Sequence, residues 1–481
     1  MFSLFYCTGF IVKQFLIESA TKIFPLHLFK NQQMRHLSLK FLSIFSLVIL
    51  ILTGCKKDDI DVRKEGLSDV SKYDAKPAVQ WIDMYRNIVI GTGINPPRAA
   101  RVYAYAGITL YESVVDGISG NRSLQGQLNG FNLNTIPANT DSLDYVIVLN
   151  EALSILAKCD TIIPNLPQSY KDNVDTLHDV ILRTRFGVLD SIVVKSKARG
   201  VAVAQAIMKY AATDNFLTVK ALPLYAVPPR DALHLWYWEP TDAAHLHPAE
   251  PYWGQMRPFV LDSSAEMEIP QSVAFTTDTA SAFGRQAREV QETVNSKTNE
   301  QNNIVLWWRD QTFAQTPAGH WMGIVQYVLP IKGYKLDKAA ELYALVGITT
   351  ADAFISCWDA KYKYNLLRPE TYIRAYIDPF WTTGQGSDIT PTFPEYPSGH
   401  SVCSGAAAKV LTDALGIVAF TDSINVTLGY QPRSFLSFDQ AAEEAAMSRL
   451  YGGIHYRDAI ENGLQQGQNV GQKVTNTIHF R

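Results

Sequence analysis

The sequence predicts an all-α protein, built as two helical bundles joined by an irregular connection rich in proline and aromatic residues. Hydrophobic residues recur at helical spacing from about residue 77 onward, and no segment shows the alternation with a period of two that is typical of strands. Seven prolines interrupt the helical pattern between residues 221 and 260. With 481 residues, 47% of them hydrophobic and 19% charged, the composition excludes disordered, collagen-like and coiled-coil proteins.

The first 54 residues are expected to be a signal peptide, with residues 1–33 as an upstream extension and Met34 as the start. Basic residues precede an apolar stretch at 41–52 that is short for a membrane span. The run Leu-Thr-Gly-Cys that ends at Cys55 resembles a bacterial lipobox, which implies a lipid on Cys55 and a place in the bacterial cell envelope. An ordinary secretory signal with an incidental cysteine is the alternative.

Cleavage before Cys55 would remove five basic residues and one acidic residue from totals of 43 and 46, leaving an acidic protein of formal charge -7. Such a chain has no overall basic field for nucleic acid, so any anion site must be built locally. Residues 55–76 are mostly charged or small and polar, and we expect them to be a tether. Membrane contact is then expected only through the lipid on Cys55, and the oligomeric state stays open.

The N-terminal bundle is expected over residues 77–220 and the C-terminal bundle over 281–481. Amphipathic spacing predicts helices in both, and Pro97 suits the first turn of one of them. The predicted helices are 97–116, 142–158, 170–185, 190–212, 281–300, 336–366, 399–416, 436–451 and 457–477. The connection between the bundles, 221–280, contains a cluster of tryptophans and tyrosines, so we expect it to pack against the protein and not to swing freely.

Residues that are suited to catalysis or anion binding concentrate in the last quarter of the chain. The first group is Lys361 and Arg368, seven residues apart, which places them on one side if a single helix carries both. Pro369 disfavours helical conformation at Arg368, so the arginine is expected at a helix end. A solvated basic helix face is the alternative interpretation.

The second group is Pro397-Ser398-Gly399-His400, which directly precedes a helix-prone run. Ser398 is a natural N-cap, and the free N–H groups of the following turn form an anion site with His400 at its mouth. A capped surface helix with an exposed histidine is the alternative.

The third group joins Arg449 to His455 across a Gly-Gly break, which lets the arginine end one helix and the histidine begin the next. Asp458, three residues further on, is expected either to orient His455 or only to favour the helix start electrostatically.

In order along the chain, these groups read KxxxxxxRP, PSGH and SRxxxxxH. This set resembles the superfamily of type 2 phosphatidic acid phosphatases, bacterial acid phosphatases and vanadium-dependent haloperoxidases, and it spans residues 361–458. The resemblance implies a vanadium chloroperoxidase and acid phosphatase-like helical fold. It also implies a pocket for vanadate, in which phosphate can take the same place, lined by Lys361, Arg368, Ser398, Gly399, His400, Arg449 and His455.

Within that pocket the resemblance implies three catalytic residues. His455 would bind vanadium, His400 would take a proton from hydrogen peroxide, and Lys361 would polarise the resulting peroxovanadate. A halide would then be oxidised to hypohalous acid. Peroxide and halide are thus the expected small-molecule partners.

Three further residues are carried over from the same resemblance. Trp358 and Phe393 resemble the aromatic pair that borders the halide side of the pocket in fungal vanadium chloroperoxidases. The segments 308–310 and 317–321 resemble family segments that precede the catalytic helices, and Asp310 is expected to pair with a pocket arginine.

Two alternatives remain at the level of sequence. In an acid phosphatase, His455 would attack a phosphate ester and His400 would protonate the leaving alcohol. The spacing of three between His455 and Asp458 departs from the spacing of four that is usual in the phosphatases. A non-catalytic lipoprotein that only captures oxyanions is the other alternative, although simple capture would not need two histidines.

Overall fold

The computed structural model describes residues 69–132, 136, 142–241, 246–385 and 390–481. The predicted signal peptide, Cys55 and the tether as far as residue 68 lie outside the described residues. The short helix η1 (Val70–Lys72) falls within the segment predicted as a tether, and Val70 is fully buried in the core. The folded part of the chain therefore begins before residue 76.

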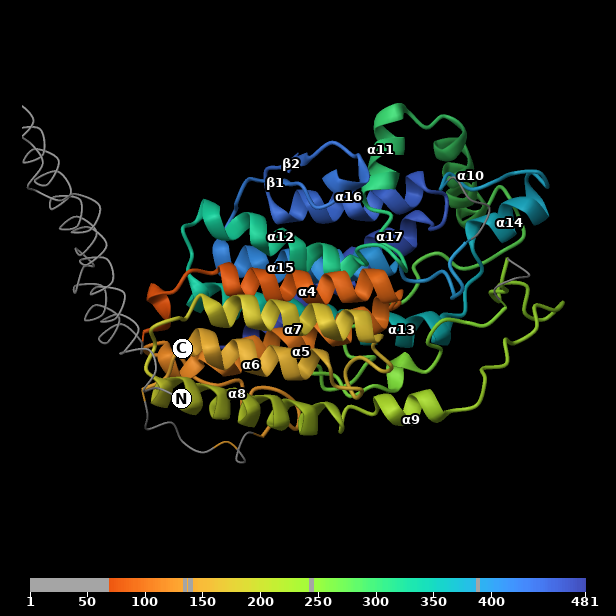
Figure 1. The fold of residues 1–481 in the computed structure, drawn as a ribbon. Helices are drawn as coiled ribbons and strands as arrows, with labels where there is room; N and C mark the ends of the chain where they lie inside the picture. Colours follow the sequence, from red (N-terminus) through yellow and green to blue (C-terminus); the bar gives the residue numbers. More distant parts are fainter. Residues whose placement is uncertain (1–68, 133–135, 137–141, 242–245, 386–389) are drawn as a thin grey trace, which may run out of the picture. The chain divides into compact units, whose positions relative to one another are not determined.

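Helices dominate the described residues, as predicted (Figure 1). Five of the α-helices, α4, α9, α11, α12 and α14, were not among the predicted ranges, although α12 and α14 each begin at a proline. The helices are α4 (Lys76–Thr92), α5 (Pro96–Val114), η2 (Val115–Gly117), α6 (Tyr145–Ala157), α7 (Gln168–Arg183), α8 (Asp190–Ala211), α9 (Phe216–Ala221), η3 (Trp253–Gln255), α10 (Ala282–Asn295), α11 (Asn299–Trp307), α12 (Pro317–Ile331), α13 (Leu336–Tyr364), α14 (Pro369–Tyr376), α15 (Gly399–Leu415), η4 (Val426–Leu428), α16 (Phe438–Tyr451) and α17 (Arg457–Thr477).

Helices α5 and α13 pack along each other, although α5 comes from the predicted N-terminal bundle and α13 from the C-terminal one. Glycines allow their backbones to approach closely. A Cβ on Gly107 would lie 2.5 Å from the carbonyl oxygen of Tyr343, and one on Gly347 would lie 2.7 Å from that of Tyr103. The two halves of the chain therefore share a core, and Glu65–Arg481 form a single compact unit.

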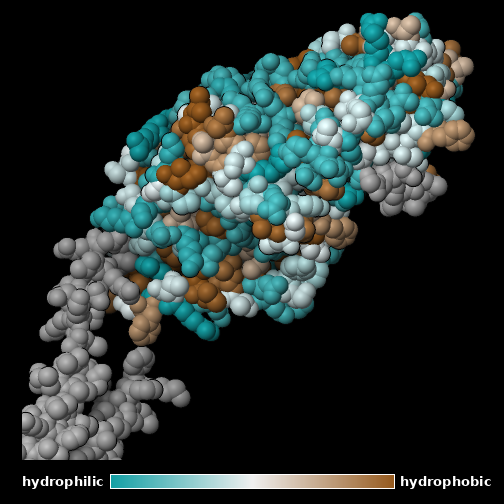
Figure 2. All heavy atoms as spheres, turned by 90° about the horizontal axis from the view of Figure 1, so that it is seen from above, coloured by the Kyte–Doolittle hydropathy of each residue, from teal (hydrophilic) through white to brown (hydrophobic). Residues whose placement is uncertain are grey.

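Helix α13 is long and apolar enough to cross a membrane by length and composition, but its apolar stretch is completely buried. It is the central helix of the core. The face seen in Figure 2 is mainly hydrophilic, with hydrophobic residues scattered in small patches. The apolar character of α13 is thus explained by burial inside the protein.

The connection between the halves packs against the protein, as predicted. Trp238 and Trp253 are 1% and 2% exposed. Tyr237 forms an isolated antiparallel bridge with Leu366, and the backbone N–H of Leu367 donates to the carbonyl of Trp236. The connection thereby braces the loop that leads to Arg368.

A two-stranded antiparallel ribbon, absent from the sequence prediction, joins α15 to α16. Strands β1 (Phe420–Asp422) and β2 (Arg433–Phe435) pair with Phe420 opposite Phe435. Each strand has only three residues, which is too short for alternation to be recognised in the sequence.

Helix α17 lies directly against α15 (Figure 1). A Cβ on Gly467 would lie 2.1 Å from the carbonyl oxygen of Val402, one turn into α15. The backbone N–H of Ser398 also donates to the carbonyl of Ala459 in α17. These contacts fix the N-terminus of α15, where the PSGH motif lies.

Candidate active site

The N-terminus of α15 is built as predicted. Ser398 is the N-cap in an extended conformation, and its hydroxyl accepts a hydrogen bond from the backbone N–H of Ser401. Gly399 begins the helix, and a Cβ there would lie 3.3 Å from the indole of Trp358. The first N–H groups of a helix lack partners inside the helix and carry partial positive charge, so this end favours an anion.

Lys361 lies in the last turn of α13 and is fully buried. Its ammonium donates to the carbonyl oxygens of Pro394 and Glu395, both at 3.0 Å, and to that of Pro397. Burial lowers the pKa of Lys361 to about 7, so the side chain loses its proton readily.

The helical spacing proposed for Lys361 and Arg368 is wrong. Helix α13 ends at Tyr364, Asn365 adopts a left-handed conformation, and Arg368 is the extended N-cap of α14. Arg368 is nevertheless at a helix end, as Pro369 predicts. Its guanidinium is buried and donates to the carbonyl oxygens of Phe393 and Ile454.

His455 is held by a residue that the sequence analysis missed. Its Nδ1 lies 2.9 Å from Oε1 of Glu395, which also accepts from the N–H of Tyr456. On the other side of the ring, Nε2 lies 3.2 Å from Nη1 of Arg368. Since Arg368 can only donate, Nε2 must be the ring nitrogen with the lone pair, and Nδ1 carries the proton.

Glu395 is fully buried, and burial raises the pKa of its carboxyl to about 8. Its Oε2 is buried and has no hydrogen-bond partner among the described residues. Its position three residues before Ser398 placed Glu395 close to a predicted site residue. However, no local sequence pattern indicates that it contacts His455, which lies 60 residues further along the chain.

The glycine break separates Arg449 from His455 as predicted. Helix α16 ends at Tyr451, Gly453 has a φ of 73°, and α17 begins at Arg457. Arg449 donates from Nη2 to the carbonyl of Trp308 at 2.7 Å. Burial lowers its pKa to about 10, while the nearby Asp310 acts in the opposite direction.

A cavity of about 450 Å³ lies over these groups. The predicted site residues among its lining are Asp310, Trp358, Phe393, Gly399, His400, Arg449 and His455. Lys361, Arg368 and Ser398 are not among the lining residues. Arg368 reaches the cavity through its contact with His455, and Ser398 directly precedes Gly399.

Both histidines of the cavity are held neutral. Burial lowers the pKa of His400 well below its usual range, with Arg449 acting in the same direction. Burial also lowers the pKa of His455, and Arg368 adds to the effect. Nε2 of His400 is buried without a hydrogen-bond partner among the described residues, so it is available to a bound molecule.

Trp358 and Phe393 lie together at the cavity wall, with ring centroids 4.9 Å apart. The ammonium of Lys361 lies 5.0 Å from the Phe393 centroid, and the guanidinium carbon of Arg368 is at the same distance from it. The aromatic pair therefore lies between the cavity and the buried cations of Lys361 and Arg368.

The two predicted acidic residues have other partners. Asp310 lines the cavity, but the hydrogen bond it accepts comes from Nδ1 of His320 at 2.8 Å, and no direct ion pair joins it to an arginine among the described residues. Asp458 does not orient His455, because its carboxylate accepts from the hydroxyl and backbone N–H of Ser272. Its position in the first turn of α17 fits the electrostatic alternative.

The donors suit a small tetrahedral oxyanion. One cavity is lined by the cation Arg449, by Gly399 at the capped helix N-terminus and by the two imidazoles of His400 and His455. The buried cations of Lys361 and Arg368 lie behind its wall at Phe393. Cations and N–H groups stabilise oxyanion oxygens, while the lone pair on His455 can bind an electrophilic central atom such as vanadium. The residues present thus fit vanadate.

Comparison with known proteins gives the same family over most of the chain. Residues 341–480 match the family model of the second helical-bundle domain of vanadium chloroperoxidase, VCPO. A crystal structure of a bacterial vanadium-dependent iodoperoxidase superimposes with a TM-score of 0.76 at 36% sequence identity, covering 85% of this chain and 97% of that chain.

More distant relatives support the fold or a short stretch of sequence. The apo form of a bacterial vanadium-dependent chloroperoxidase superimposes with a TM-score of 0.59 at 14% identity, over 79% of this chain and 92% of that chain. The vanadium chloroperoxidase of Curvularia inaequalis is 36% identical over 84 residues, which span 15% of this chain and 14% of that protein. On the extent of the match to the iodoperoxidase, the chain belongs to the family of vanadium-dependent haloperoxidases.

Proposed function

We propose that this protein oxidises halide ions with hydrogen peroxide, using vanadate held in the cavity at the N-terminus of α15, and releases hypohalous acid. The observation that carries the proposal is the pairing of two neutral imidazoles at one cavity. His455 offers a lone pair on Nε2, and Nε2 of His400 has no hydrogen-bond partner among the residues that the structure describes.

The chain's own residues would hold the vanadate. The lone pair of His455 would bind vanadium, and Lys361, Arg368 and Arg449 would offset the charge on the oxygens. The hydroxyl of Ser398 and the N–H of Gly399 would donate hydrogen bonds to the same oxygens. When bound, vanadate supplies a Lewis-acidic centre that activates peroxide towards halide.

His400 is suited to accept a proton from hydrogen peroxide. A general base must be unprotonated at the working pH, and the lowered pKa of His400 keeps its ring neutral. Nε2 of His400 is buried and has no hydrogen-bond partner in the described part of the chain, so it is free for this contact.

Iodide is the halide that we propose as the best substrate. The relative that matches 85% of this chain is an iodoperoxidase, and iodide is the most easily oxidised of chloride, bromide and iodide. The cavity wall formed by Trp358 and Phe393 has the cations of Lys361 and Arg368 next to it, and these cations would attract a halide anion.

Purified protein incubated with orthovanadate tests this proposal. With iodide as substrate, the peroxide-dependent formation of triiodide is measured. With bromide or chloride as substrate, the halogenation of a dimedone derivative is measured. We expect the highest kcat/KM with iodide, and loss of turnover in His455→Ala. Hydrolysis of nitrophenyl phosphate by vanadate-free protein, together with no halide oxidation, would contradict the proposal and favour the phosphatase alternative.

We also propose that the protein is exported and anchored in the bacterial cell envelope by a lipid on Cys55. The support is the signal-like sequence that ends in Leu-Thr-Gly-Cys. Growth of the expressing cells with labelled palmitate should label the wild type and not Cys55→Ser. Equal labelling of both, or recovery of both in the cytosol, would contradict this proposal.

A further inference from the structure

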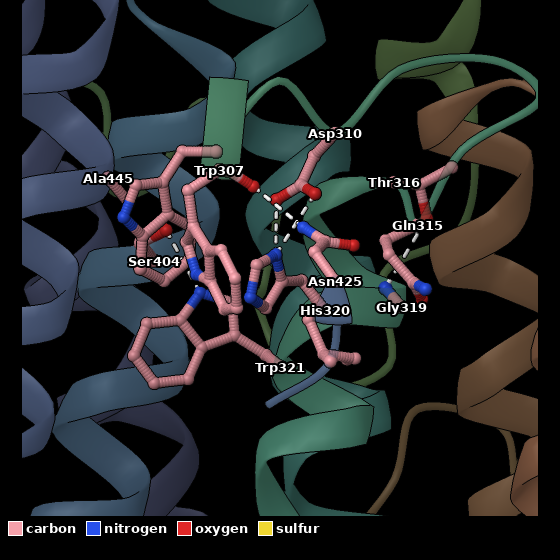
Figure 3. A network of polar contacts seen from close by, with 12 residues as sticks. Trp307, Asp310, Gln315, Thr316, Gly319, His320, Trp321, Ser404, Asn425 and Ala445 are labelled. Atoms are coloured by element: carbon pink, nitrogen blue, oxygen red, sulfur yellow. Dashed lines mark hydrogen bonds and ion pairs between the residues drawn. The ribbon is translucent and has the colours of Figure 1, made fainter. Parts of the chain in front are cut away.

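A third histidine lies beside the cavity, outside the residues that were assigned to the anion pocket above. His320, in the first turn of α12, is fully buried between two carboxylates. Its Nδ1 lies 2.8 Å from Oδ2 of Asp310, and its Nε2 lies 2.7 Å from Oδ2 of Asp422. Figure 3 shows the ring of His320 directly below Asp310, with Asn425 beside them.

Both ring nitrogens of His320 must carry protons in this arrangement, since each faces a carboxylate oxygen at hydrogen-bond distance and carboxylates only accept. Burial alone would lower the pKa of His320, but Asp310 and Asp422 outweigh it and raise the pKa to about 10. His320 is therefore an imidazolium ion at neutral pH, unlike His400 and His455.

The carboxylate of Asp422 is itself fixed by further hydrogen bonds. Oδ2 of Asp422 also accepts from the indole N–H of Trp307, and Oδ1 accepts from the backbone N–H of Ile424. Asp422 lies at the end of β1, so the ribbon that the sequence did not predict supplies this anchor. His320 thereby links the ribbon to Asp310 at the cavity wall.

The pocket arginine is tied to the same cluster by a second route. The ring of Trp308 stacks on His320 with centroids 4.3 Å apart and planes 20° apart. The carbonyl oxygen of Trp308 accepts the hydrogen bond from Nη2 of Arg449 at 2.7 Å. The segment from Trp308 to Asp310 thus binds Arg449 through the carbonyl of Trp308. At its other end, it binds His320 through the carboxylate of Asp310.

We propose that His320 is a positioning residue for the oxyanion pocket: its imidazolium, bound to Asp310 and Asp422 and stacked on Trp308, fixes the segment that holds Arg449. The inference rests on the proposed use of the pocket for vanadate. His320 touches neither halide nor peroxide in this role. It sets the geometry of Arg449 and balances the charge of Asp310 beside the anion.

Replacement of His320 and of Asp422 should have different effects on anion binding. His320→Gln removes a cation and leaves two carboxylates facing one neutral amide, so both charge and position become worse for an anion. Asp422→Asn removes a negative charge and keeps an oxygen acceptor for His320. Both variants lose a buried interaction and should unfold at lower temperature than the wild type.

The test is the dissociation constant of orthovanadate for purified apo-protein, measured by titration calorimetry, with folding checked by circular dichroism. We expect His320→Gln to bind vanadate at least about tenfold more weakly, and Asp422→Asn to bind at least as tightly as the wild type. His178→Gln is the matched control, because His178 also contacts two carboxylates but lies on α7 outside the cavity lining.

Wild-type affinity in folded His320→Gln would overturn the inference. Weaker binding by folded Asp422→Asn, in proportion to its loss of stability, would also overturn it, because it would indicate a general structural role. The Asp422→Asn result applies even if His320→Gln does not fold. Failure of the wild type to bind vanadate would refute the proposed function of the pocket instead.

Discussion

Oε1 of the Glu395 carboxyl group lies 2.9 Å from Nδ1 of His455 and fixes which nitrogen of that ring faces the cavity. A ligating histidine commonly donates its second N–H to such an acceptor, which fixes the tautomer and the ring orientation. The lone pair of His455 is therefore directed towards the bound anion by a residue that does not itself line the cavity.

Removal of the Glu395 acceptor should weaken vanadate binding. In Glu395→Ala, Nδ1 of His455 loses its partner, and we expect the dissociation constant of orthovanadate to rise by about 10- to 100-fold. Glu395→Gln is the matched control. Its amide oxygen can still accept from Nδ1, and the raised pKa of Glu395 means that a neutral side chain already resembles the native state near pH 7. Equal affinities for the wild type and Glu395→Ala in calorimetry would contradict the assigned role.

Removal of the Phe393 ring should affect halide use more than folding. The ring lies beside the cations of Lys361 and Arg368, and cation–π contacts contribute about 0.5–2 kcal/mol, or roughly 2- to 30-fold in an equilibrium or rate. We expect Phe393→Ala to lower kcat/KM for iodide by this factor, measured with saturating peroxide. Phe393→Leu keeps apolar volume without the ring, so equal losses in both variants would assign the effect to the aromatic ring. Wild-type kcat/KM in Phe393→Leu would contradict this prediction and assign the effect to packing.

The contact of α17 with α15 should tolerate no side chain at Gly467. A Cβ there would lie 2.1 Å from the carbonyl of Val402, so Gly467→Ala must separate the two helices. Overpacking of this kind typically costs about 1–3 kcal/mol, and we expect a lower melting temperature together with weaker vanadate binding, since α15 carries the PSGH motif. Gln468→Ala, on the exposed face of α17, is the control and should change neither measurement.

Most of the helices could be predicted from sequence, because helical spacing and capping are local signals. Of the seven residues that the resemblance placed in the anion pocket, Gly399, His400, Arg449 and His455 line the cavity, whereas Lys361, Arg368 and Ser398 do not. Serine is a common N-cap, and proline favours an extended conformation in the residue before it. The structure confirms both signals, at Ser398 and at Arg368, which precedes Pro369. The prediction that one helix carries both Lys361 and Arg368 was wrong, because Asn365 adopts a left-handed conformation and ends the helix between them.

The residues that position the pocket side chains without being predicted as part of the pocket could not be found from local signals. Glu395 meets His455 across 60 positions of sequence, and His320 meets Asp422 across 102. No periodicity or motif links such partners, because only the packed helices bring them together. Asp458 lies much nearer to His455 in sequence, yet Ser272 binds it.

Vanadate affinity should depend on pH through Lys361. Its pKa in the free protein is lowered to about 7 by burial, whereas a bound oxyanion favours the charged ammonium and raises the pKa. Binding therefore takes up a proton above pH 7, so affinity should be level below pH 7 and fall by up to about tenfold for each pH unit above it.

Lys361→Arg isolates this effect, because arginine stays charged and the ionisation of vanadate itself is common to both proteins. The fall in affinity between pH 7 and 9, measured by calorimetry, should be steeper for the wild type than for Lys361→Arg. Parallel curves would mean that Lys361 keeps its proton throughout this range and that its burial is offset by the carbonyl oxygens of Pro394, Glu395 and Pro397.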